Sequence, residues 1–512
     1  MSSSRTSYVV KNIGAAGFFQ LFALFLSFVS RTIFVRLLGN DYLSCEGLFS
    51  NVLTILSFTE LGIGSSIIYS LYKPIADEDK VQIGKLMNLF RKSYIWIACI
   101  ISFVGLSVIP FMDYIVKDVP SVKESIILLY LLFLGNTVAS YIFGYKRSFL
   151  IACQKNYVVL TIQQVFNVVR IALQVGLLLW THDYVLYLAI AIVCTLGGNI
   201  VSTYITNRQY PWLNGYLNNQ LTKEERKPIV TNILAIIQYK LGYVFLQGTG
   251  NILISVCIAT YWVGICSNYN LIIGAIQSLL SQLFSSVQST IGNFNTLANE
   301  TDKKRLFFTM YFINFWVTGV IIVMIALFIS PFVSNIWLGK EYELDTFTSL
   351  SICFSFYVLI SNMVPSTFRS AMGFFKQAKG CPLYAALLNI VLCLIFSKWM
   401  GLSGIFIAHG IARLFTFSVI DAYYVSKLGI GISPLLIYKR IVVYGLSLVG
   451  IYIIESNLMT FIPITNDGIG GFCINVALFF IVTNLLLFIL YFRTQDFQNS
   501  YTYIIQHIKR KK

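Results

Sequence analysis

Apolar runs of about 20 residues alternate with short polar segments along the whole chain. At 1.5 Å per residue, a helix of roughly this length crosses a bilayer core of about 30 Å. The first run is too long for a signal peptide and is followed by no cleavage site. We expect fourteen spanning helices, near residues 13–38, 46–72, 93–116, 124–150, 157–180, 184–208, 229–256, 260–292, 306–329, 345–372, 383–400, 402–425, 439–461 and 470–492.

The composition agrees with this pattern. Of 512 residues, 57% are hydrophobic and only 11% are charged, against roughly a quarter charged in soluble domains. The chain is therefore predicted to be an all-α polytopic membrane protein. Its ten cysteines are scattered, without a CxxC pair or a histidine cluster, so no metal or redox site is expected.

The distribution of charge predicts the orientation. The formal net charge is +16. If the amino terminus is cytoplasmic, the inner side holds 28 of the 37 basic residues and the outer loops hold four. This asymmetry follows the positive-inside rule, so both termini are predicted to be cytoplasmic and the charge does not indicate nucleic acid as a partner.

An internal repeat divides the chain. Residues 47–51 read GLFSN, and residues 264–268, which lie 217 positions later, read GICSN. The same offset superimposes the first predicted helices on the seventh and following ones, which predicts two six-helix lobes related by a pseudo-two-fold axis along the membrane normal. Such parallel repeats are typical of transporters that bind substrate between the halves. The predicted parts are an N-lobe (1–208), an inter-lobe linker (209–228), a C-lobe (229–426) and two further helices with a basic tail (427–512).

Five basic residues are counted with neither side and fall inside predicted spans: Arg31, Arg36, Arg170, Lys240 and Arg413. Basic residues near the inner ends of spans, such as Lys146, Arg147 and Arg369, are counted with the inner side. A cation near the bilayer centre costs about 2.5 to 3.5 kcal/mol, so it usually faces a wet cavity or a partner. Arg36, close to a helix end, is expected to reach the outer headgroups. The acids Glu60 and Asp421 lie toward the cytoplasmic end, so Arg31 is predicted to have no acidic partner at its depth. We therefore predict an anionic substrate, bound by Arg31, Arg170, Lys240 and Arg413.

Further polar residues inside the spans are weaker candidates for the same cavity. His409 lies one turn from Arg413, and Glu60 and Asn268 complete this second group. The amides inside the spans are candidates to bind hydroxyls, and most of them are expected instead to join helices by hydrogen bonds: Asn136, Asn167, Asn251, Asn268, Asn270 and Asn389. No catalytic residue is predicted, and no P-loop or nucleotide-binding domain is present in the sequence, so the chain is not expected to be an enzyme or an ATPase.

The opening region resembles a known family. The run VRLLGNDYLSCEGLFSNVLTILSFTELGIGSSIIYSLYKPIA at 35–76 and the segment ATYWVGICSNYNLI from 259 resemble the Wzx-type lipid-linked oligosaccharide flippases of the MOP exporter superfamily. The resemblance implies two six-helix lobes around a cationic cavity. It also implies transfer of undecaprenyl-diphosphate-linked sugar repeat units from the inner to the outer leaflet of the bacterial cytoplasmic membrane, for surface polysaccharide biosynthesis.

The resemblance further implies its partners: a polyprenyl-diphosphate-linked oligosaccharide, membrane lipid, glycosyltransferases and a polysaccharide polymerase. No cofactor is expected, and a proton or a sodium ion are the candidate coupling ions. Two alternatives stay open. One is a multidrug or cation antiporter of the same superfamily, although cationic drugs call for acidic cavity residues. The other is a membrane polymerase or ligase, which would be expected to carry a larger outer loop.

Overall fold

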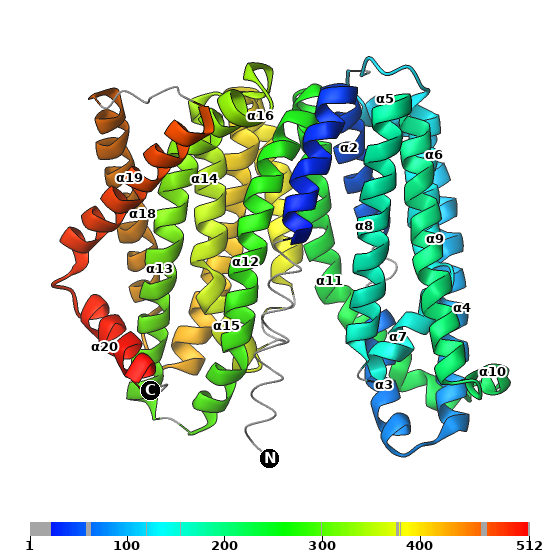
Figure 1. Cartoon of the computed structure of the whole chain (residues 1–512). Helices are drawn as coiled ribbons and strands as arrows, with labels where there is room; N and C mark the ends of the chain where they lie inside the picture. Colours follow the sequence, from blue (N-terminus) through cyan, green and yellow to red (C-terminus); the bar gives the residue numbers. More distant parts are fainter. Residues whose placement is uncertain are drawn as a thin grey trace. The chain divides into compact units, whose positions relative to one another are not determined.

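The computed structural model describes residues 22–57, 63–118, 120–153, 155–297, 299–374, 378, 380–461 and 468–509. Within these ranges every regular element is a helix (Figure 1). Nine of the described helices are long and apolar enough to cross a membrane, and a bent pair adds a tenth. The protein is therefore an all-α polytopic membrane protein, as the sequence predicts.

The chain forms two compact units, Met1–Gly264 and Ile265–Lys512. The lobe boundaries predicted from the repeat stay a prediction. Helix α12 (Tyr261–Leu297) begins at the end of unit 1 and continues into unit 2. The other helices of unit 1 are a helix over 22–38, α2 (Asn40–Leu56), α3 (Ile63–Ala76), α4 (Lys80–Ser107), η2 (Ile109–Phe111), α5 (Met112–Ile115), α6 (Ile126–Tyr141), α7 (Tyr145–Ala152), α8 (Asn156–Thr181), α9 (Tyr184–Gln209), α10 (Leu213–Tyr216) and α11 (Lys223–Cys257).

Unit 2 is built around α13, whose side chains are buried on most of its faces. Helices α14, α18, α19 and α20 all pack against it. The helices of unit 2 after α12 are α13 (Glu300–Pro331), η3 (Phe332–Trp337), η4 (Lys340–Tyr342), α14 (Thr346–Ser361), α15 (Met363–Ala371), α16 (Cys381–Arg413), η5 (Leu414–Ser418), α17 (Val419–Tyr424), η6 (Val425–Gly429), α18 (Pro434–Phe461), α19 (Gly468–Tyr491) and α20 (Gln495–Lys509).

Each of the fourteen predicted segments overlaps a described helix or a broken pair of helices. The count of fourteen crossings stays a prediction, because the stretch Cys381–Gly429 counts as one span by length and composition. Within it, Gly401 leaves the helical conformation, with φ 58°. The chain doubles back there, since a Cβ on Gly404 would lie 2.3 Å from the carbonyl oxygen of Phe396.

The repeated motif lies where helices approach closely inside unit 1. Gly264 has no room for a side chain, because a Cβ there would lie 2.3 Å from Oδ1 of Asn40. Its amide instead donates to Oγ of Ser44. Asn251 of α11 donates to the carbonyl oxygen of Gly47, 3.0 Å away. This confirms that Asn251 joins helices by a hydrogen bond, as the sequence predicts for most of these asparagines.

Candidate functional site

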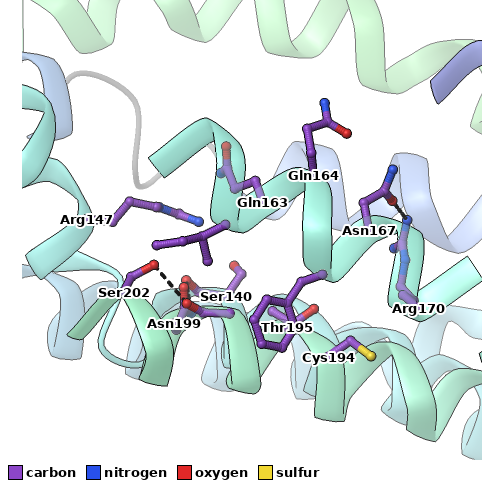
Figure 2. A pocket seen from close by; sticks show the side chains of 13 residues that line it. Ser140, Arg147, Gln163, Gln164, Asn167, Arg170, Cys194, Thr195, Asn199 and Ser202 are labelled. Carbon is purple, nitrogen blue, oxygen red and sulfur yellow. Dashed lines mark hydrogen bonds between the residues drawn. The ribbon is translucent and has the colours of Figure 1, made fainter. Parts of the chain in front are cut away.

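A polar cavity of about 340 Å³ lies within unit 1, among helices α6 to α9 (Figure 2). Its lining residues on α9 run from Cys194 to Ser202, a length of about 12 Å along the helix. No carboxylate is found among the described residues that line it. They are Ser140, Arg147, Ile162, Gln163, Gln164, Phe166, Asn167, Arg170, Cys194, Thr195, Gly198, Asn199 and Ser202.

Helix α8 contributes a polar stripe to this cavity. Gln163, Asn167, Arg170 and Gln174 follow one another at spacings of three and four residues, which places them on one face of the helix. The guanidinium of Arg170 donates from Nη2 to Oδ1 of Asn167 at 2.7 Å (Figure 2). Farther along, Gln174 is buried and donates to the carbonyl oxygen of Tyr187. The stripe therefore presents one oriented arginine and several amides to the cavity.

The opposite wall depends on a break between α6 and α7, which bend by 42° relative to each other. A broken helix frees carbonyl groups that must find donors inside a membrane. Asn199 of α9 is buried and supplies them, because its Nδ2 donates to the carbonyl oxygens of Ala139, Ser140 and Ile142. We conclude that Asn199 shapes the cavity by stabilising the bend between α6 and α7. Because its Nδ2 already donates these hydrogen bonds, it is not available to a substrate.

Arg147 is a cavity residue that the sequence analysis missed. The sequence analysis counted it with the inner-side cations. In the structure it lies in α7, just after the break between α6 and α7, and lines the cavity. Figure 2 shows Arg147 and Arg170 at opposite ends of the group of labelled side chains. Among the described residues, the Arg147 side chain has no hydrogen bond or ion pair. A half-buried guanidinium without a partner is suited to binding an anion.

The neighbouring Lys146, also counted with the loops, is buried. Its ammonium group donates to Oδ1 of Asn207 and, at 3.0 Å, to Oδ1 of Asn214. Lys146 therefore ties α7 to α9 and to α10. Two adjacent basic residues thus differ in role, because α7 turns one toward the cavity and the other into the packing.

The structure corrects the prediction for Arg31. Its Nη1 lies 3.7 Å from Oε2 of Glu46 in α2, so an acid does lie within its reach. The sequence analysis overlooked Glu46 because it stands at the very start of a predicted span. Arg36, in contrast, is exposed, in line with its predicted place at the headgroups.

Arg413 and His409 lie one turn apart in unit 2. Arg413 ends the α-helical part of α16 and is followed by the π-helical segment η5; such segments are frequent at functional sites. The ring of His409 packs edge-on against Phe406, and its buried Nε2 has no hydrogen-bond partner among the described residues. Asn268 of α12 is fully buried in the same unit, which favours a packing role for it.

Asp421 has a partner of its own. Its Oδ1 lies 2.6 Å from Nε of Arg369, and both side chains are almost completely buried. Asn362 also donates to Oδ2 of Asp421 at 2.8 Å. Arg369, counted by the sequence analysis with the inner-side cations, is therefore part of the interior of unit 2.

Of the predicted site residues, Arg170 lies in the polar cavity and Arg31 lies in an ion pair of the same unit. The side chain of Lys240 and the whole of Glu60 lie outside the described residues. That the four cations share one cavity stays a prediction. The structure adds residues that the sequence analysis did not single out: Glu46, Arg147, Gln163, Gln164, Thr195 and Ser202. For those on α8, the spacing of polar residues along the helix was the signal in the sequence.

No protein-family model matches the sequence. No curated protein matches it either. Solved structures do resemble it. The lipid II flippase MurJ in an inward closed conformation is similar over 93% of this chain and 98% of its own, with a TM-score of 0.63 and 15% identity.

Two transporters of the MATE type are also similar. An inward-facing multidrug resistance MATE family transporter of the MOP superfamily matches 82% of this chain and 95% of its own, with a TM-score of 0.59 and 15% identity. The MATE transporter VcmN from Vibrio cholerae, solved as a mutant, matches 83% of this chain and 98% of its own, with a TM-score of 0.56 and 14% identity. At such identities the likeness establishes the fold, and the chain therefore has the fold of MOP superfamily transporters.

Proposed function

We propose that the protein is a flippase that moves a polyprenyl-diphosphate-linked oligosaccharide from the inner to the outer leaflet of a bacterial cytoplasmic membrane, for surface polysaccharide biosynthesis. The observation that carries the proposal is the cavity of unit 1, whose described lining includes Arg147 and Arg170 and no carboxylate. Arginine offers paired donors to phosphate oxygens. The amides of Gln163, Gln164 and Asn167 suit sugar hydroxyls.

The cost of placing arginines inside a membrane supports this interpretation. A cation held near the bilayer centre without an acid must be compensated by water or by a ligand. Arg170 is held by Asn167, which carries no charge, so its positive charge remains available to an anion. A diphosphate would supply the missing negative charge, and the amides along the same cavity would meet attached sugar.

An apolar cavity of about 570 Å³ in unit 2 supports a lipid-linked substrate. It lies among α13, α14 and α18, and hydrophobic side chains such as Ile322, Leu350 and Leu446 line it almost entirely. Such a site suits a hydrocarbon chain rather than a polar solute. In this proposal it accepts hydrocarbon, either from a lipid-linked substrate or from a membrane lipid.

Among the structural neighbours described above, MurJ is a lipid II flippase, and the other two are MATE transporters. The multidrug alternative requires acids for cationic drugs, and the unit 1 cavity has none among its described lining. The proposed mechanism is alternating access, with a proton or a sodium ion as the candidate coupling ion. The termini are proposed to be cytoplasmic, in agreement with the basic tail.

Proteoliposomes containing a labelled undecaprenyl-diphosphate oligosaccharide test this function. We expect the wild type to expose the label to the opposite leaflet, and Arg147→Gln and Arg170→Gln to slow this at least tenfold. Arg36→Gln is the matched control, because Arg36 is exposed and lies outside the cavity. Unchanged transfer in both cavity variants would refute the binding assignment.

The same vesicles distinguish the alternatives. Uptake of an organic cation such as ethidium without transfer of the labelled lipid would favour a multidrug antiporter. New glycosidic bonds between labelled units would favour a polymerase or ligase. Either result would overturn the proposed function.

A further inference from the structure

The ion pair between Arg31 and Glu46 is loose. The 3.7 Å between Nη1 and Oε2 is too long for a hydrogen bond. The side chains keep 19% and 31% of their exposed surface, so both remain within reach of water. Nη1 of Arg31 is itself buried and has no hydrogen-bond acceptor among the described residues.

A group of aromatic residues packs one helical turn from Arg31. Phe34, one helical turn after Arg31, packs edge-on against Tyr184 and Tyr187, with ring centroids 5.6 and 5.3 Å away. The side chain of Tyr184 is fully buried, and its hydroxyl has no hydrogen-bond partner among the described residues. Tyr184 is linked to Arg31 through Phe34, which stands on the same helix as Arg31.

Two buried polar atoms of this region, Nη1 of Arg31 and the hydroxyl of Tyr184, therefore have no hydrogen-bond partner among the described residues. Unsatisfied buried donors cost about 1 to 3 kcal/mol each, and proteins rarely leave them so without a functional reason. Glu46 neutralises the charge of Arg31 but does not complete its hydrogen bonds. A tetrahedral oxyanion has more oxygens and no tether, so it completes the hydrogen bonds of Arg31 more readily than Glu46 does.

We propose that Glu46 is an internal competitor that occupies Arg31 until an oxyanion of the substrate, a phosphate group, displaces it. The proposal rests on the proposed function only in naming the substrate's diphosphate as that oxyanion. The partial exposure of Glu46 lets its side chain swing away from Arg31 when the anion arrives. Glu46 thereby sets a threshold, since only an anion that binds Arg31 better than a carboxylate takes its place.

The opposite role for Glu46 is to hold Arg31 in a productive position. The two roles predict opposite signs for Glu46→Gln, which keeps the shape and removes the charge. A competitor's removal strengthens anion binding, by up to about fivefold for a partly exposed pair. Removal of a positioning residue weakens it.

Inorganic pyrophosphate is the probe, measured by calorimetry on the purified full-length protein at fixed pH and ionic strength. The background carries Arg147→Gln and Arg170→Gln, so that the polar cavity does not contribute. We expect Glu46→Gln to bind pyrophosphate about three- to fivefold more tightly than this background. Glu224→Gln, at an exposed glutamate in the first turn of α11, is the control and is expected to change nothing.

Arg31 supplies the second arm. Arg31→Lys keeps the charge but loses the paired donors, so binding should weaken, and Glu46→Gln should strengthen it less in the Arg31→Lys variant. Weaker or unchanged binding in Glu46→Gln, or no pyrophosphate binding in any variant, overturns the inference. If Glu46→Gln tightens binding while the wild type fails to move labelled lipid, the inference stands and the proposed function fails. If the wild type moves labelled lipid but Glu46→Gln does not tighten pyrophosphate binding, the proposed function stands and the inference fails.

Discussion

The two ion pairs Arg31–Glu46 and Arg369–Asp421 differ in almost every physical respect. In unit 2 the charged atoms of Arg369 and Asp421 lie 2.6 Å apart, with 5% and 1% of their side chains exposed. In unit 1 those of Arg31 and Glu46 lie 3.7 Å apart and are partly exposed. The Arg369–Asp421 pair is short and buried, whereas the Arg31–Glu46 pair is long and partly exposed. A charge inside a span is therefore not by itself a sign of a binding site, because a buried partner can hold it in the packing.

The largest effect is expected from breaking the buried pair. Arg369→Met leaves Asp421 buried without a counter-charge, which should lower the free energy of unfolding by about 3 to 5 kcal/mol. Denaturant titration of the purified protein in micelles measures this. The double variant Arg369→Met/Asp421→Leu should recover most of the loss, because no charge then remains buried. Wild-type stability in Arg369→Met would show that the pair is not buried as described.

A smaller loss is expected when the neighbouring donor is removed. Asn362→Ala deprives Oδ2 of Asp421 of its 2.8 Å hydrogen bond and should cost about 1 to 3 kcal/mol in the same titration. The control is Asn457→Ala, since Asn457 is exposed and bonds only within its own helix turn. If Asn362→Ala and Asn457→Ala destabilise the protein equally, the hydrogen bond from Asn362 to Asp421 contributes nothing of its own to stability.

The loose pair should contribute little to stability. Glu46→Gln is expected to change the free energy of unfolding by at most about 1 kcal/mol, because partly exposed pairs gain little over water. This holds even though the same variant is expected to alter pyrophosphate binding. A loss comparable to that of Arg369→Met would place Arg31–Glu46 among the structural pairs and erase the contrast.

The smallest effect is expected at the start of α11. A hydrogen bond from the backbone of Thr222, followed by one from Lys85, lowers the pKa of Glu225. A lowered folded-state pKa gives a contribution that is present above the unfolded pKa and is lost as the pH falls through the folded value. Between pH 7 and about pH 3, the wild type should therefore lose slightly more thermal stability than Glu225→Gln. If the wild type and Glu225→Gln show the same pH dependence of thermal stability, ionised Glu225 does not stabilise the start of α11.

Several charged residues show why sequence reasoning succeeded only in part. Arg170 was singled out as a cation inside a predicted span, and it lines the polar cavity. Arg147 was not, because a break in the helix after Tyr141 turns it toward the cavity. Lys146 and Arg369 were counted as inner-side cations, yet both are buried. Asparagines accept hydrogen bonds from Lys146, and Asp421 forms an ion pair with Arg369.

The length and hydrophobicity of the apolar runs determined the membrane class and the places of the helices, because the cost of exposing polar groups to lipid acts on each segment by itself. The partners of the charges were decided only by the tertiary structure. Whether Arg31 meets Glu46 or Arg147 faces a cavity depends on which helices pack side by side and where they bend. Those contacts join residues that are distant in the sequence, so hydrophobic periodicity alone does not record them.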